Sequence, residues 1–210
     1  MFCGGVMDIH PKLIFTEPLE RNGYTWTLAS QLGNMLRLAE QRFGPRDRSY
    51  TFVGIEFVNG VPQIWFPGNC QHVAIQLGLP CMNEPDRACF QLAHETIHLL
   101  SPTGSNDPNV LEEGLAAHFQ SWYMKNHYPP DWPMSCVDWN TLACKSYEKA
   151  RALVHELLKF GDDIIKKLRV AEPTLSRITA KLIQECVPAV LSPSKDGPTL
   201  HRNEDPLIGF

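Results

Sequence analysis

Two stretches decide what this chain can form: residues 83–100, NEPDRACFQLAHETIHLL, and residues 111–119, LEEGLAAHF. In the first stretch apolar side chains recur every three or four positions from Phe90 to Leu100. That spacing predicts an amphipathic helix with one buried face. Asn83 is the predicted N-cap of this helix, with Pro85 in its first turn. The second stretch predicts another helix beyond a loop that contains Pro, Gly, Ser and Asn.

The first helix contains the sequence HETIH, from His94 to His98. Residues four apart on an α-helix differ by about 40° in angle and about 6 Å in rise, so both imidazoles can bind one metal ion. Glu95 lies about 100° round the helix from His94, where its carboxylate reaches water beside a metal rather than the metal itself. The plain alternative is an amphipathic helix with two polar residues near its face.

Glu113 is the predicted third metal ligand. A hydrolytic zinc site takes three protein ligands and keeps one position open, so the two histidines leave one ligand to be found. Fourteen residues separate His98 from Glu113, enough for a loop that lays a second helix beside the first. Gly114 has no side chain and would let those two helices approach closely. Asp107, in the intervening loop, is the alternative ligand.

HETIH followed by LEEGLAAHF resembles the gluzincin metallopeptidases, in which HExxH is followed by a segment such as WLNEGxAxYF. The resemblance covers roughly residues 50–123. It implies a zincin-like fold, one zinc ion per chain held by His94, His98 and Glu113, and Glu95 as the base that activates a zinc-bound water. Glu112 stands where the family has Asn, and the spacer is shorter than in the large aminopeptidases. Glu112 is either an acceptor for a ligand imidazole or a solvated carboxylate.

The least defined part of the site is the side chain that would donate a hydrogen bond to the oxyanion, which forms as the peptide carbonyl is attacked. The candidates are Tyr147, His155, Tyr123, His118 and His127. Tyr147 is the predicted donor, because in several small gluzincin-like proteins a tyrosine on the helix after the third ligand returns to the site. The alternative for each candidate is a side chain packed at the edge of the core.

The whole chain predicts an α+β, zincin-like fold, with a small twisted sheet packed on the HExxH helix and a helical C-terminal part. A single domain is expected over residues 25–190, with an N-terminal arm at 1–24 and a mobile tail at 191–210. A helix is expected over 25–43, followed by a hairpin of strands 51–58 and 61–66 around Asn59-Gly60, whose second strand lies at an edge of the sheet. A third strand is expected over 72–78. The C-terminal part is expected to contain a long helix over 143–169 and a helix over 173–187 that is capped at Glu172.

Composition excludes several classes of protein. Of 210 residues, 43% are hydrophobic and 20% charged, as in globular rather than disordered chains. The net charge of −4 argues against a dedicated nucleic-acid binder. No apolar run reaches the roughly 18 residues that span a bilayer, so no membrane association is expected. Seven cysteines without a CxxC pair, and an N-terminus unlike a secretory signal, predict a cytoplasmic location.

The predicted function is a zinc-dependent metallopeptidase that hydrolyses peptide bonds. No GxMEN-type exopeptidase motif is present, which favours an endopeptidase. The alternatives are a catalytically silent binding or regulatory protein on the same fold, and a zinc hydrolase that acts on other bonds. The Trp- and Pro-rich segment 122–139 has three interpretations: a wall of the substrate cleft, a dock for a regulatory protein partner, or a packed irregular loop.

Overall fold

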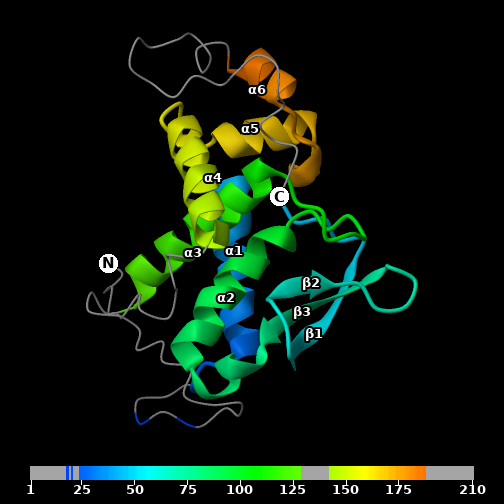
Figure 1. The fold of residues 1–210 in the computed structure, drawn as a ribbon, viewed down its shortest axis with the longest axis vertical. Helices are drawn as coiled ribbons and strands as arrows, with labels where there is room; N and C mark the ends of the chain where they lie inside the picture. Colours follow the sequence, from blue (N-terminus) through cyan, green and yellow to red (C-terminus); the bar gives the residue numbers. More distant parts are fainter. Residues whose placement is uncertain (1–17, 19, 21–23, 129–141, 188–210) are drawn as a thin grey trace.

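The computed structural model describes Pro18, Glu20 and residues 24–128 and 142–187. Over these residues the chain forms an α+β fold with a three-stranded mixed sheet and six α-helices (Figure 1). The elements are α1 (Leu28–Phe43), β1 (Thr51–Val58), β2 (Gln63–Trp65), β3 (His72–Gly78), η1 (Leu79–Asn83), α2 (Pro85–His98), α3 (Val110–His127), α4 (Leu142–Leu158), α5 (Ile164–Ala171), η3 (Leu175–Arg177) and α6 (Ala180–Cys186), where η marks a short 3₁₀ helix. Most of the predicted arm, the predicted tail at 191–210 and residues 129–139 lie outside the described residues.

The helix predicted over residues 25–43 is confirmed as α1. Thr27 and Ser30 form a capping box, in which the Ser30 N–H donates to Thr27 Oγ1 and the Thr27 N–H donates to Ser30 Oγ. Gly44 follows the helix with a φ of 100°, a conformation that glycine adopts without strain. The buried face of α1 packs against α2, which stabilises the helix that carries HETIH.

The sheet has the strand order β1-β3-β2, with β1 parallel and β2 antiparallel to β3. The predicted hairpin around Asn59-Gly60 is therefore wrong, because β3 lies between the two strands that it would have joined. The strand predicted over 72–78 is confirmed, and β2 is an edge strand as predicted next to Pro62. β3 takes the centre because most of its side chains are apolar and buried: Val73, Ala74, Ile75 and Leu77.

The HExxH helix begins one residue later than a cap at Asn83 would place it. Asn83 ends the 3₁₀ helix η1, and Glu84 occupies the N-cap position of α2 without a side-chain capping bond. Pro85 stands at the first helical position, where its missing N–H costs nothing. The helix then runs to His98 and packs against α1, α3 and the sheet (Figure 1).

Helix α3 packs between α2 and α4 (Figure 1). A Cβ added at Gly114 would lie 2.2 Å from the Ala150 carbonyl oxygen and 3.0 Å from Val154 Cγ2, both on α4. The predicted contact of Gly114 with the HExxH helix is thus a contact with α4 instead. Gly114 follows Glu113 directly, so the residue that allows this close approach adjoins a predicted ligand.

The single helix predicted over 143–169 is wrong, because the chain turns at Gly161 between α4 and α5. Gly161 has a φ of 129°, which few residues other than glycine adopt. The helix predicted over 173–187 is likewise divided into η3 and α6. The N-cap of α6 is Thr179, whose Oγ1 accepts the Leu182 N–H at 3.2 Å, rather than Glu172.

Buried Arg169 of α5 ties the C-terminal part to the rest of the fold. Its guanidinium donates to the main-chain carbonyls of residues 43–45 at the end of α1 and just beyond it. It also donates to the carbonyls of Leu100, after α2, and of Pro173. A buried cation is tolerated when its N–H groups are hydrogen-bonded in this way. The contact with Leu100 fixes the chain two residues beyond His98.

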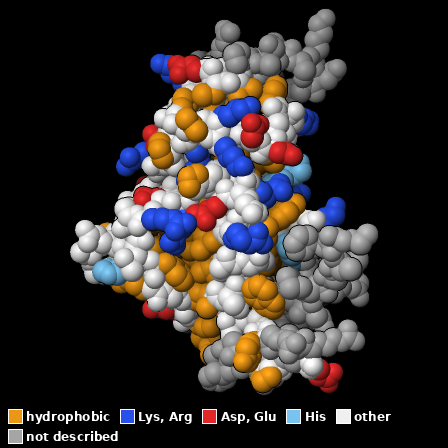
Figure 2. Space-filling view, turned by 180° about the vertical axis from the view of Figure 1, so that it is seen from behind, with side chains coloured by type: hydrophobic (Ala, Val, Ile, Leu, Met, Phe, Trp, Pro, Cys, Tyr) orange, Lys and Arg blue, Asp and Glu red, His pale blue; other side chains and the backbone are white. Residues whose placement is uncertain are grey.

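The face opposite to that in Figure 1 carries Lys and Arg side chains interspersed with Asp, Glu and apolar side chains (Figure 2). Among the described residues on this face, the charges do not form the continuous basic stripe that is typical of a nucleic-acid binder.

The contact at Gly114 predicts a large loss of stability for Gly114→Ala. Since the new methyl group meets backbone atoms of α4, the helices must separate, and the free energy of unfolding should fall by about 1–3 kcal/mol. Gly33→Ala is the matched control. Gly33 is an exposed helical glycine with open space around it, and its replacement should stabilise by about 0.5–1 kcal/mol. Urea unfolding monitored by circular dichroism measures both changes, and equal stability of the two variants would contradict the packing described.

Candidate metal centre

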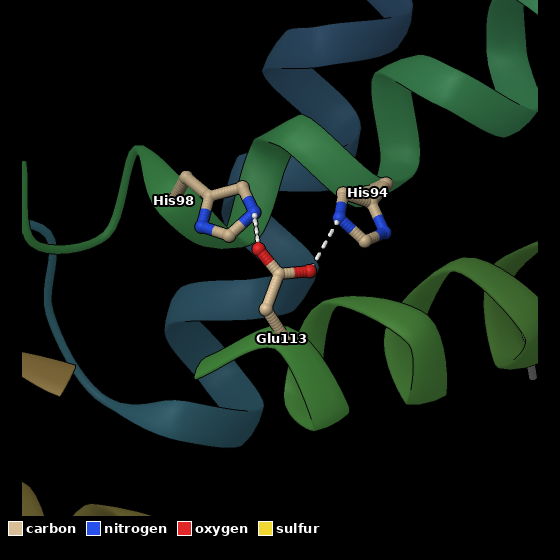
Figure 3. A group of neighbouring side chains, drawn as sticks. All are labelled: His94, His98 and Glu113. Atoms are coloured by element: carbon tan, nitrogen blue, oxygen red, sulfur yellow. Dashed lines mark ion pairs between the residues drawn. The ribbon is translucent and has the colours of Figure 1, made fainter. Parts of the chain in front are cut away.

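Two neighbouring helices bring the predicted ligands together. α2 presents His94 and His98 one turn apart on one face, and α3 presents Glu113 in its first turn (Figure 3). One ligand atom from each of the three residues lies within 4.8 Å of the others. His98 and Glu113 are buried, and His94 is partly buried. The sequence therefore predicted correctly which three residues converge.

The spacing of these atoms suits a small tetrahedral cation. His94 Nε2 lies 3.3 Å from Glu113 Oε2, and His98 Nε2 lies 3.6 Å from Glu113 Oε1. Ligands about 2.0–2.1 Å from a tetrahedral zinc ion stand about 3.3 Å from one another. Glu113 Oε2 is buried and accepts no hydrogen bond among the described residues, although His94 Nε2 is within ion-pair distance. The donor set of two imidazole nitrogens and one carboxylate therefore fits a zinc ion.

Glu112 orients one of the two imidazoles. Its Oε1 lies 2.9 Å from His98 Nδ1, and both side chains are buried. A carboxylate can only accept this bond, so Nδ1 carries the hydrogen and Nε2 faces Glu113. Of the two interpretations left open by the sequence, the acceptor for a ligand imidazole is the one that the structure shows. Partners of this kind fix the ring orientation in metal sites and raise the basicity of the ligand.

The charges of the site depend on one another. Burial disfavours the imidazolium form of His98, but the hydrogen bond and charge of Glu112 and the neighbouring carboxylates raise its pKa to about 10. Burial alone would raise the pKa of Glu113, yet its contact with His94 and the charge of both histidines lower it. Protonated imidazole thus balances the carboxylates here, a task that a divalent cation performs in a metal-loaded site.

Glu95 lies beside the triad without belonging to it. Its side chain is 3% exposed, and burial raises its pKa, with His98 and His94 acting in the opposite direction. A carboxyl group whose pKa is shifted towards neutrality can accept and return a proton at physiological pH.

A pocket of about 640 Å³ gives access to these groups. The triad and Glu95 line it from α2 and α3, residues 61–64 line it from the region of the edge strand, and Tyr147 lines it from α4. The ring centroid of Tyr147 lies 5.5 Å from that of His94, with the ring planes at 80°. The edge of one aromatic ring thus meets the face of the other, which holds both side chains at the pocket wall.

The other four candidates for an oxyanion donor do not line this pocket. Tyr123 is fully buried, and its hydroxyl donates to Gln31 Oε1 at 3.1 Å. His118 and His155 contact each other with ring centroids 5.1 Å apart. His127 packs on Tyr123 at 4.5 Å. Tyr123 therefore fits the alternative of packing in the core, and His118 and His127, which are partly buried, fit packing at its edge, whereas His155 is exposed.

Asp107, the alternative third ligand, lines the pocket but is exposed and does not join the histidines.

Asn109 is a positioning residue that the sequence analysis missed. Its Oδ1 accepts the Glu112 N–H at 2.9 Å, and its Nδ2 donates to the carbonyls of Leu175 and Ile178. Asn directly before the helical segment LEEG is the sequence signal of an N-cap, and it sets where α3 begins.

No protein-family model, curated protein or solved structure matches the chain. The resemblance to gluzincins therefore rests on the motif residues and their geometry alone. In the part of the chain that the structure describes, no helix is long and apolar enough to cross a membrane.

The bond between Glu112 and His98 predicts a weaker metal site in Glu112→Gln. The neutral amide loses the charge that stabilises the donating imidazole, so the affinity for zinc should fall by about 10- to 100-fold. Competition with a chromogenic chelator measures this affinity. Glu84→Gln is the control, since Glu84 is an exposed carboxylate that pairs with Arg87. Unchanged affinity in Glu112→Gln would contradict the orienting role.

Proposed function

We propose that the protein is a zinc-dependent metallopeptidase. The observation that carries this proposal is the buried group His94, His98 and Glu113 on the wall of an open pocket, with buried Glu95 beside it. Two imidazoles and one carboxylate are the ligand set of many hydrolytic zinc sites, which leave a fourth position for water or substrate. A zinc ion bound there would supply a Lewis acid for a carbonyl oxygen and make water a nucleophile at neutral pH.

Glu95 is the proposed general base. Its raised pKa and its position next to both histidines support a carboxylate that takes a proton from the attacking water. The same carboxyl group then gives the proton to the leaving nitrogen, so that one residue acts first as base and then as acid. Its burial keeps the proton from exchanging freely with bulk water between the two steps.

Tyr147 is the proposed donor to the oxygen that becomes negative as the peptide carbonyl is attacked. Two observations support this assignment: its ring packs against His94, and it is the one member of the five candidates that lines the pocket. A hydroxyl held against rigid helices costs little reorganisation when charge develops, and one such donor contributes about 3–4 kcal/mol to transition-state stabilisation.

The neighbouring edge strand supports a peptide as the substrate. β2 pairs with β3 on one side only, and residues 61–64 line the pocket. An extended peptide can add to such an edge through main-chain hydrogen bonds, which also holds the scissile bond in a fixed direction. Apolar side chains in the pocket, such as Ile64, Phe90 and Pro102, offer surface for substrate side chains.

Glu95→Gln is predicted to keep zinc and lose turnover. The amide preserves the shape of the side chain but cannot accept the proton, so cleavage of a peptide library should fall by at least about 100-fold. Mass spectrometry of the cleaved peptides, together with elemental analysis of the same preparation, measures both properties.

Tyr147→Phe serves as the second variant in this experiment. It should lower kcat by about 100-fold or more with little change in KM, because the hydroxyl acts only as charge develops. Robust cleavage by Glu95→Gln would contradict the mechanism. A zinc-loaded wild-type protein that cleaves no peptide would instead favour a binding protein or a hydrolase of other bonds.

A further inference from the structure

The pocket continues beyond the triad between α3 and α4. On α4, Arg151 follows Tyr147 by four residues, about one helical turn, and both line the pocket. On α3, Ala117 and Ser121 follow Glu113 by four and eight residues and also line it. These residues of the two helices therefore line the part of the pocket that extends from the triad to Arg151, which we call the channel.

Ser121 holds the arginine at the far end of this channel. Arg151 Nη1 donates to Ser121 Oγ at 3.1 Å. Eight residues along α3 separate Ser121 from Glu113, a rise of about 12 Å. An extended peptide spans that distance with about three or four residues. A group bound at Arg151 would thus belong to a substrate residue a few positions from the scissile bond.

Arg151 forms no ion pair within the described part of the chain, and the one hydrogen bond of its guanidinium there is to the neutral hydroxyl of Ser121. The other arginine of the pocket, Arg87, pairs with Glu84 at 3.3 Å. Glu148 also lines the pocket, but it is exposed and is not within ion-pair distance of Arg151. The guanidinium has five N–H donors in a fork that matches a carboxylate, and four of these donors have no hydrogen-bond partner among the described residues.

Arg151 and Arg42 both lie close enough to His118 for their charges to act on it. Burial first, and then the charges of His155, Arg42 and Arg151, lower the pKa of His118 to about 4. At the other end of the channel Glu95, Glu112 and Glu113 concentrate negative charge. Negative charge is therefore concentrated at the triad end of the channel, and the positive charge of Arg151 lies at the other end.

We propose that Arg151 determines specificity by binding a carboxylate of the peptide substrate. The carboxylate is an acidic side chain or the C-terminus, a few residues from the bond that is cleaved. This inference rests on the proposed function, since it assigns the substrate class of that same pocket. The charge-assisted pair should orient the peptide in the channel as well as tighten its binding.

The test measures binding rather than cleavage. Four fluorescein-labelled octapeptides share one apolar sequence and differ in two places, an internal Glu or Gln and a C-terminal acid or amide. Fluorescence anisotropy with zinc-loaded Glu95→Gln protein should show an acidic peptide binding about tenfold tighter than the fully neutral one. The singly acidic peptide that binds more tightly shows whether an acidic side chain or the C-terminus supplies the carboxylate.

Substitutions at Arg151 then test whether this residue causes the preference for acidic peptides. Arg151→Met should reduce the ratio of acidic to neutral affinity to about one, and Arg151→Lys should restore part of it, because lysine keeps the charge but not the planar fork. Arg87→Met is the matched control and should keep the wild-type ratio. Zinc content and thermal unfolding of each variant check that the fold and the triad are intact.

The outcomes separate the two proposals. Binding of all four peptides with equal affinity, or a preference that survives in Arg151→Met, would overturn the role of Arg151 and leave the proposed function standing. Binding of none of the peptides by the zinc-loaded protein would overturn both.

Discussion

The structure depends on charge balance in a buried site. Glu95, Glu112 and Glu113 face His94 and His98 at the boundary of an apolar core. Burying carboxylates is costly unless cations or hydrogen-bond donors compensate them. Two imidazoles cannot neutralise three carboxylates, and the raised pKa of Glu95 and of His98 both reduce the imbalance. A divalent cation between the ligands would remove it more completely, which is why the arrangement makes physical sense as a metal centre.

The rest of the fold holds this arrangement from three directions. Asn109 fixes the first turn of α3, where the two neighbouring glutamates lie. Gly114 lets α4 approach, which brings Tyr147 and Arg151 to the same pocket as the triad. Arg169 anchors the chain just beyond His98. The arrangement of the triad and its pocket thus depends on contacts among α2, α3, α4 and α5.

The sequence predicted the site better than the sheet, for a physical reason. Both histidines belong to one helix, so their separation follows from helical geometry, and Glu113 belongs to a segment that matches a known pattern. The Asn59-Gly60 signal is local, whereas strand order depends on which strand buries most apolar surface, and β3 displaced the expected hairpin. The bonds of Glu112 and Arg169 join residues far apart in the sequence, which spacing alone does not reveal.

The central claim is that His94, His98 and Glu113 form a zinc site, and metal content tests it most directly. Wild-type protein, Glu113→Ala and Asp107→Ala would be purified without chelator or nickel resin and examined by elemental mass spectrometry. The structure predicts about one zinc per chain in the wild type and in Asp107→Ala, because exposed Asp107 stands apart from the histidines. Glu113→Ala should contain clearly less. Absence of metal from the wild type, or equal metal in all three, would contradict the claim.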